Sequence, residues 1–176
     1  MAKKVTVSLL TVEKFLPVLK ESFHGDDRTM AIMCAALLED ALEQLLRAQL
    51  RQSKVSDRLF VSEQPLGSFA AKISIAFATG MIGDMTHEDL VRIKDIRNIF
   101  AHHILLDDEE MKLNPVSFTS QAVRDISRQL KFPSFFSLCE SDPKKRYQFT
   151  CLVILARFHF ALLNRKEKAT LWEEIM

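Results

Sequence analysis

Glycine and proline are scarce in this chain, whose 176 residues include four glycines and five prolines. Both counts fall well below ordinary usage, so the sequence offers few of the tight turns that join neighbouring β-strands. Few segments combine β-branched residues with the strict alternation of apolar and polar positions that is typical of strands. A hydrophobic content of 48% is enough for a substantial core. These features predict an all-α fold, which we expect to be a single domain, residues 1–176, built as a bundle of five or more helices.

An excess of either charge is also missing. Lysine and arginine together number 24 against 23 aspartates and glutamates, which gives a formal net charge of +1. The field of the whole protein therefore shows no footprint of a polyanion-binding surface. This balance neither indicates nor excludes a nucleic acid as partner.

Cysteine is rare as well. Cys34, Cys139 and Cys151 are an odd number without a closely spaced pair, a pattern that fits neither a disulfide framework nor a zinc site. The sequence also has no glycine-rich phosphate loop and no nucleophile elbow. We therefore expect no cofactor, no metal, and a location in the reducing cytoplasm.

The apolar runs of this sequence are shorter than a membrane-spanning helix requires. The opening residues, MAKKVTVSLL, are followed by polar and charged residues before the apolar region of a signal peptide is complete. The most apolar run, Phe149–Leu163, is shorter than the ~20 residues that span a bilayer, and Arg157 and His159 interrupt it. We expect no membrane contact and interpret this run as a buried helix of the bundle.

Apolar periodicity and capping residues predict where the helices lie. Helices are expected over residues 8–21, 28–51, 69–80, 86–103 and 120–130, with a last long helix from residue 143 onward. Residues 53–68 and the acidic stretch after residue 103 are expected to be irregular.

Three of these helices carry more specific signals. Met30–Leu38 is apolar on every side, which predicts a central helix that is almost wholly buried there. Ser68 is a suitable N-cap for the helix that follows it. Thr86 and Asp89, three positions apart, form an imperfect capping box that predicts the start of the next helix.

The end of that helix, KDIRNIFAHH (Lys94 to His103), mixes an apolar edge with polar residues that packing does not require. Arg97 and His102 are five positions apart, about 140° on a regular helix, so they converge on one ligand only if the helix frays or ends between them. An imidazole can exchange a proton with a ribose 2′-hydroxyl or a leaving oxygen, while a guanidinium stabilises charge on a phosphate. Arg97, Asn98 and His102 therefore form a set that suits RNA cleavage.

A structural role for the same residues is an open alternative. Arg97 could pair with Glu39 or Asp40 on the long preceding helix. His102 could act as a cation that faces the exposed carbonyls at a helix end. These contacts would stabilise the fold without any catalysis.

The spacing of the motif resembles the conserved signature of the HEPN superfamily. Arg97 is followed by four residues and then His102, with the polar Asn98 next to the arginine. Many members of that superfamily are metal-independent ribonucleases built on a helical bundle. The resemblance implies RNA as the substrate and Arg97, Asn98 and His102 as the catalytic residues.

A longer segment, PLGSFAAKISIAFATGMIGDMTHEDLVRIKDIRNIFAHH, resembles the diagnostic segment of the mannitol operon repressor family. The shared features are Pro-Leu-Gly, a helix with one basic residue followed by an apolar run, a glycine, and a short turn into the next helix. The resemblance covers roughly residues 28–103. It implies an all-α bundle and a bacterial cytoplasmic transcriptional regulator.

Together these observations predict a repressor-type regulator of a bacterial sugar-alcohol or related operon. No recognition helix or basic face stands out, so direct DNA binding is disfavoured, and we expect a homodimer that acts through a protein partner. The alternative is an HEPN-like, metal-independent endoribonuclease of toxin or defence type, and a third possibility is a structural bundle without a ligand. The histidines and carboxylates of AHHILLDDEE are interpreted as a solvated loop rather than a metal site.

Overall fold

The computed structural model describes residues 17, 20–21, 23–107, 113–131 and 142–173, with side chains as far as residue 164. Its elements in chain order are α2 (Asp27–Gln49), α3 (Lys54–Arg58), α4 (Phe69–Ala78), α5 (Asp84–His102), β1 (Leu105–Asp107), β2 (Leu113–Pro115), α6 (Gln121–Arg128) and α7 (Pro143–Glu173). The predicted all-α bundle is confirmed, since one small antiparallel hairpin is the only sheet among the described residues. Most of the predicted helix 8–21, and Cys139, lie outside the described residues.

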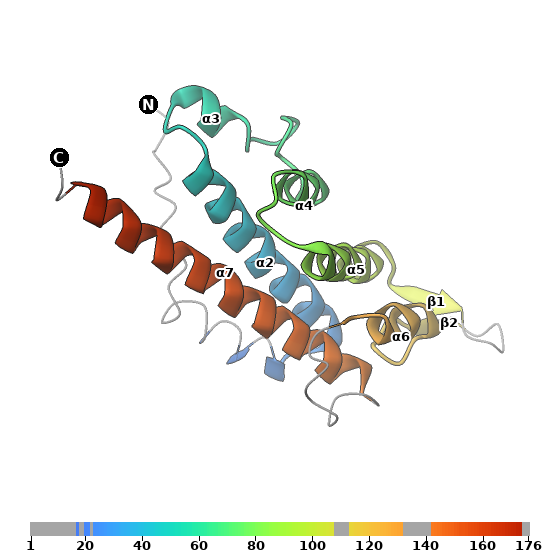
Figure 1. Ribbon diagram of the computed structural model, residues 1–176. Coiled ribbons are helices and arrows are strands. Elements are labelled where there is room, and N and C mark those ends of the chain that lie inside the picture. The colour runs from blue at the N-terminus through green and yellow to red at the C-terminus, as the bar shows by residue number, and fades with distance from the viewer. Residues whose placement is uncertain (1–16, 18–19, 22, 108–112, 132–141, 174–176) are drawn as a thin grey trace.

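Helix α2 is the central helix, because α4, α5 and α7 all pack against it (Figure 1). Helices α2 and α7 begin at the same end of the bundle, where the Lys144 ammonium lies 2.8 Å from the Asp27 carboxylate. One turn further on, the buried hydroxyl of Tyr147 donates a 2.8 Å hydrogen bond to the carbonyl of Ala31. Burial raises the pKa of Tyr147 well above its usual value, so the phenol remains a hydrogen-bond donor. These two contacts fix the alignment of α7 along α2.

The prediction that Met30–Leu38 is almost wholly buried is wrong on one side of the helix. Met30, Cys34 and Leu38 have no exposed surface, as expected of a core stripe. Met33, however, is 37% exposed, and Leu37 is only partly buried. The three partner helices cover one side of α2, and the apolar residues of the other side remain in contact with solvent.

Local hydrogen bonds correct three of the predicted boundaries. Residues 53–68 are not wholly irregular, because the Ser53 hydroxyl accepts from the amide of Ser56 at 3.1 Å and caps the short helix α3. The stretch after residue 103 is not a plain loop either, because β1 and β2 pair in it. The hairpin is anchored by Val116, which is buried and whose amide donates to the carbonyl of Ile104 at 3.1 Å.

The third correction concerns the start of α5. The helix begins at Asp84 with Gly83 as N-cap, because the amide of His87 already donates to the carbonyl of Gly83. Thr86 therefore lies in the first turn and is not the cap. Asp89, its predicted capping partner, is fully buried and accepts a 2.8 Å hydrogen bond from the amide of Lys131 beyond α6. By contrast, the predicted cap at Ser68 is confirmed, since its hydroxyl accepts from the amide of Ala71.

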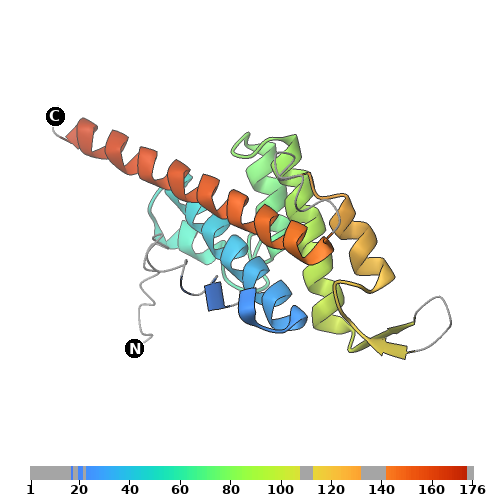
Figure 2. The same cartoon turned by 90° about the horizontal axis from the view of Figure 1, so that it is seen from below.

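Helix α7 extends beyond the other helices toward the carboxyl terminus (Figure 2). By length and composition alone, its segment Pro143–Asn164 is long and apolar enough to cross a membrane, and 39% of its most apolar stretch is buried inside the protein. Cys151, Ile154 and Leu155 are fully buried or nearly so, and this stripe belongs to the same core as α2. The packing is that of a bundle helix.

Two substitutions on α2 measure how one-sided its burial is. Leu38→Ala is expected to lower the free energy of unfolding by about 2–5 kcal/mol, because it removes a fully buried side chain and leaves a cavity. Met33→Ala should cost less than about 1 kcal/mol, since Met33 already contacts solvent and alanine favours the helix. Urea unfolding of both variants provides the measurement. Equal losses would mean that something covers Met33 in solution.

Candidate functional site

The motif helix α5 contacts α2 and α4 through a cluster of charged side chains, which we call the charged cluster and which comprises Glu39, Glu43, Lys72 and Arg97. Lys72 is its centre: the side chain is 6% exposed, and its ammonium lies 2.9 Å from Glu39 and 2.8 Å from Glu43. Lys72 is also the one charged residue of α4. An otherwise apolar helix therefore directs its single cation at two carboxylates of α2.

Burial and pairing oppose each other in this cluster. Burial alone would lower the pKa of Lys72, but the hydrogen bonds and charges of Glu43 and Glu39 outweigh it and hold the pKa above its ordinary value. Burial alone would raise the pKa of Glu43, but hydrogen bonds from Lys72 and Arg47 bring it below its ordinary value. Both groups are thus held in their charged forms. For the neighbouring Asp40, burial prevails and raises the pKa, although a hydrogen bond from Gln44 opposes the shift.

Arg97, the first residue of the candidate catalytic set, belongs to this cluster. One end of its guanidinium lies 3.6 Å from the Glu39 carboxylate, so the predicted contact with Glu39 is present. Another nitrogen donates a 3.0 Å hydrogen bond to the side-chain oxygen of Asn98. The Arg97 side chain nevertheless keeps 33% of its surface exposed. Arg97 is thus oriented by two neighbours and remains accessible to a ligand.

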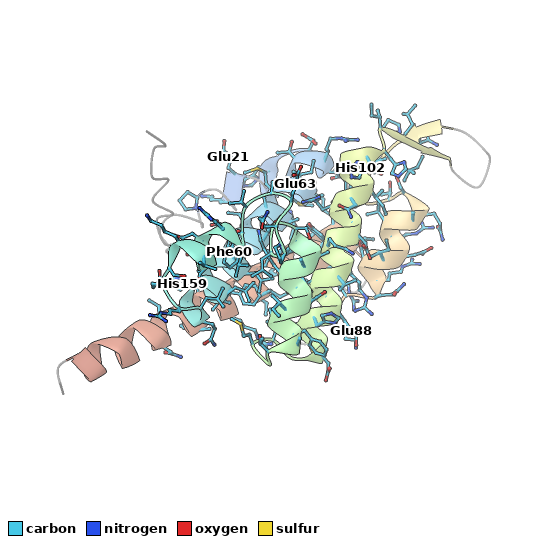
Figure 3. The ribbon with its side chains drawn as sticks, turned by 90° about the horizontal axis from the view of Figure 1, so that it is seen from above. Glu21, Phe60, Glu63, Glu88, His102 and His159 are labelled. Atoms are coloured by element: carbon cyan, nitrogen blue, oxygen red, sulfur yellow. The ribbon has the colours of Figure 1, made fainter. Side chains whose placement is uncertain are left out.

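His102 lies at the other end of the motif and is exposed (Figure 3). The carbonyls at this helix end do not depend on it, because Arg28 of α2 donates to the carbonyls of Phe100 and His103. Among the described residues, no group forms a hydrogen bond or an ion pair with the His102 side chain. The structure thus assigns the capping role, which the sequence suggested for His102, to Arg28.

Helix α5 continues without a break from Arg97 to His102. On a continuous helix the two residues are about 140° apart around the axis and about 7.5 Å apart along it. The fraying or early end that would let them converge within one chain is absent from this helix. A phosphate bound by both would need a second copy of the chain that brings its own helix end close.

A metal site is not formed by the described residues, since no three histidine, cysteine or acidic side chains gather there. The acidic residues that follow Asp107, Asp108 to Glu110, lie outside the described residues. The cysteines Cys34 and Cys151 are buried and form no disulfide, and burial raises the pKa of Cys151 well above its usual value. This thiol stays protonated and is a poor nucleophile.

Sequence reasoning missed Lys72 and Arg28. The signal for Lys72 was present, because a single lysine in the apolar segment FAAKISIAFA must find a counter-charge when that segment packs. Arg28 carried no comparable signal, since its partners are main-chain carbonyls 72 and 75 positions away in the sequence.

Comparison of the chain with protein-family models, with curated proteins and with solved structures gave no match. The two family resemblances therefore stay predictions.

Replacing Lys72 tests whether the charged cluster is held by charge. Lys72→Met should lower the free energy of unfolding at pH 7 by about 3 kcal/mol, because it leaves Glu39 and Glu43 half-buried without their central cation. In the wild type, the lowered pKa of Glu43 contributes stability that is lost as the pH falls through that value. In the variant the two carboxylates repel each other, and protonation removes this repulsion. The difference in the free energy of unfolding between the variant and the wild type should therefore shrink between pH 7 and pH 4.

Lys131→Met is the matched control, because Lys131 is 43% exposed and its ion pair with Glu88 lies at the surface. Lys131→Met should lower the free energy of unfolding by about 0.2–1 kcal/mol, which is typical of the loss of an exposed ion pair. A Lys72→Met deficit of the same size at pH 4 and pH 7 would show that packing rather than charge is lost.

Proposed function

We propose that this chain is a repressor-type regulator of a bacterial sugar-alcohol or related operon that acts by binding a protein partner. The resemblance of residues 28–103 to the mannitol operon repressor family supports the regulatory role. The observation that carries the proposed mode of action is the outer face of α4, which is exposed and carries no charge.

We call this surface the α4 face and define it by the exposed residues of the helix, which are Ala70, Ser74, Ile75, Phe77 and Ala78. Ile75 is 37% and Phe77 is 39% exposed, while Lys72, the single charge of the helix, points into the protein. A surface helix of a monomeric protein usually presents charged residues to water. An uncharged outer face with exposed aliphatic and aromatic side chains is typical of a protein contact.

Part of this face is held in a fixed shape. The Phe77 ring stacks on the His87 ring of α5 at 4.4 Å between centroids. Ser68 caps the helix start, and Lys72 ties its inner side to α2. A preorganised helix face loses little conformational entropy on binding, which favours its use as a docking surface.

The basic residues of α6 support the expectation that direct DNA binding is weak. Lys131, just beyond the helix, lies 2.7 Å from Glu88 of α5, and Arg128 lies 4.0 Å from Asp125. Arg124 donates to the side chain of Gln121. A DNA phosphate would meet the carboxylates of Glu88 and Asp125 beside these cations, so this helix lacks the uniform positive face of a reading element.

Charge placed on the α4 face should abolish regulation. The double variant Ser74→Glu, Ala78→Lys adds a favourable pair four positions apart on a helix and leaves net charge and core unchanged. In a deletion strain the proposal predicts raised transcripts of the regulated operon, restored to wild-type level by the natural protein and not by this variant. Transcript sequencing provides the measurement.

The matched control is Val55→Glu with Val61→Lys, which places the same two charges at positions 72% and 57% exposed outside the α4 face. This control should repress normally. If the α4 variant represses as well as the control, or if the isolated protein binds its operator with nanomolar affinity and sequence preference, the proposed mode of action is wrong. Sedimentation of wild type and variant will show whether the α4 face also forms the expected homodimer.

The HEPN-like ribonuclease is retained as a second candidate because Arg97 and His102 are both accessible. Asn98 orients the Arg97 guanidinium at 3.0 Å, as a residue in a supporting role would. The imidazole of His102 is exposed at the helix end, where it is available for proton transfer. Since the two residues lie far apart around one helix, this candidate requires a composite site across a dimer.

An assay on labelled RNA distinguishes the two candidates. The ribonuclease candidate predicts cleavage in the presence of EDTA that falls at least about a hundredfold in His102→Ala. The regulator candidate predicts no cleavage by either protein. Because His102 has no partner among the described residues, the substitution should change stability by less than about 0.5 kcal/mol, so a loss of activity would not reflect unfolding. His103→Ala, the exposed neighbour, is the control.

A further inference from the structure

Two cysteines, Cys34 of α2 and Cys151 of α7, lie in the core of the bundle. Neither side chain has any exposed surface, and both belong to the same core. They are 117 positions apart in the chain, so no local spacing marks them as a pair. The helices that carry them pack against each other along their length (Figure 1). Whether the two thiols meet therefore depends on how α2 and α7 are aligned.

Helices α2 and α7 begin level with each other and run in the same direction. Lys144 pairs with Asp27 in their first turns, and these two residues are also 117 positions apart. A step of seven residues is close to two full turns, so it returns to the same face of a helix about 10.5 Å further on. Cys34 follows Asp27 by seven positions, and Cys151 follows Lys144 by seven. This alignment places the two cysteines level with each other on the facing sides of the helices.

Contacts around the two cysteines show that these faces meet. One turn before them, the Tyr147 hydroxyl donates to the Ala31 carbonyl at 2.8 Å. The Cys151 thiol is hydrogen-bonded to the Cys34 thiol, and neither forms a disulfide. Beside Cys34 on α2, Ala31 and Ala35 are buried and small, and small side chains at a contact let two helices approach closely. The fold thus brings two thiols into contact across the interface of α2 and α7.

We propose that Cys34 and Cys151 are a redox pair, which hydrogen peroxide converts into a disulfide that joins α2 to α7. One sulfur, as its thiolate, attacks a peroxide oxygen; the O–O bond breaks, hydroxide leaves, and a sulfenic acid forms. The second sulfur then attacks the first, the S–O bond breaks, and the oxygen leaves as water. The two thiols give up two electrons and two protons, and the peroxide takes them up to form two molecules of water. This inference does not depend on the proposed regulatory function.

Burial sets the rate of the first step. The thiolate, not the thiol, is the nucleophile, and burial holds the pKa of Cys151 well above its usual value. A brief opening of the contact between α2 and α7 must therefore precede an attack by this sulfur. The second step is fast by comparison, because the two sulfurs adjoin once the helices close again. The reaction therefore starts slowly and continues to the disulfide rather than stopping at the sulfenic acid.

The disulfide closes a loop that contains α3, α4, α5 and α6. A cross-link over so long a loop removes conformational freedom from the unfolded chain, which stabilises the folded state. The oxidised protein should therefore melt at a temperature roughly 10 °C above that of the reduced protein. Dithiothreitol should reverse this shift. The pair thus gives the chain two states of different stability, set by oxidation.

Peptide mapping of the oxidised full chain tests the pair. The reduced protein is treated with hydrogen peroxide in native buffer, and the remaining thiols are blocked with N-ethylmaleimide after unfolding. The digest is then analysed by mass spectrometry without reductant. The peptides that contain Cys34 and Cys151 should be joined, with the loss of two hydrogen atoms. Melting curves before and after oxidation provide the second measurement.

Oxidation in concentrated urea shows which pair the chain forms without its fold. Cys139 and Cys151 are 12 positions apart, against 117 for Cys34 and Cys151, and loop closure favours the shorter loop by roughly thirtyfold. The unfolded chain should therefore join Cys139 to Cys151, whereas the native protein should join Cys34 to Cys151. A different product in the two conditions shows that the contact between the helices selects the pair.

Single substitutions provide matched variants. Cys139→Ser keeps the pair and should retain both the cross-link and the rise in melting temperature. Cys34→Ala removes one partner and should lose both, and Cys151→Ala replaces it in the comparison if Cys34→Ala does not fold. Should neither fold, the peptide map of Cys139→Ser decides alone.

Several results would overturn the proposal. Peroxide could leave the thiols of Cys34 and Cys151 free in the native protein, or oxidise them to sulfinic acid without a cross-link. The native protein could join Cys139 to Cys151, or give the same product as the unfolded chain. An equal rise in melting temperature in Cys139→Ser and Cys34→Ala would also contradict it.

Discussion

Packing against α2 is the constraint on which the other elements depend. Its core stripe, which includes Met30, Leu38 and Leu42, has no exposed surface because α4, α5 and α7 close over it together. Removing any one of these helices would expose the stripe to water at roughly 25 cal/mol per Å² of apolar area. The position of the motif helix α5 is therefore set by its packing in the core and does not depend on the role of its polar residues.

Polar contacts from α2 then set the position of each neighbour. Arg28 binds the carbonyls at the end of α5, and Asp27 accepts from the amide of Phe118 at 2.9 Å while it pairs with Lys144 at the start of α7. Further along, Glu39 and Glu43 bind Lys72 of α4. Each of these contacts joins segments far apart in sequence, so together they fix the bundle in one arrangement. The net stability that a buried cation between two carboxylates contributes is small, because its desolvation offsets much of the attraction.

The proposed functions occupy the surfaces that this arrangement leaves open. With its one charge turned inward, α4 presents an uncharged face outward, which suits a protein partner. The same packing leaves a cavity of about 420 Å³ between α2, the turn that joins α4 to α5, and α7, with buried apolar residues in its lining. The accessible Arg97 and His102 lie at a third position, around the end of α5.

Local patterns in the sequence determined the helical class, the extents of α2, α4 and α6 to within a few residues, the start of α7, and the cap at Ser68. These features depend on neighbours within one or two turns, which the sequence displays directly. The contact of Arg97 with Glu39 was also foreseen as one of two options, because the pattern placed both on adjoining helices. Only the tertiary structure decided that Met33 faces solvent, that Arg28 caps α5, and that Asp89 is buried and accepts from the amide of Lys131. The reason is physical: each outcome depends on which distant segments come into contact. The type of a residue and its sequence neighbours do not show which helix will pack against it.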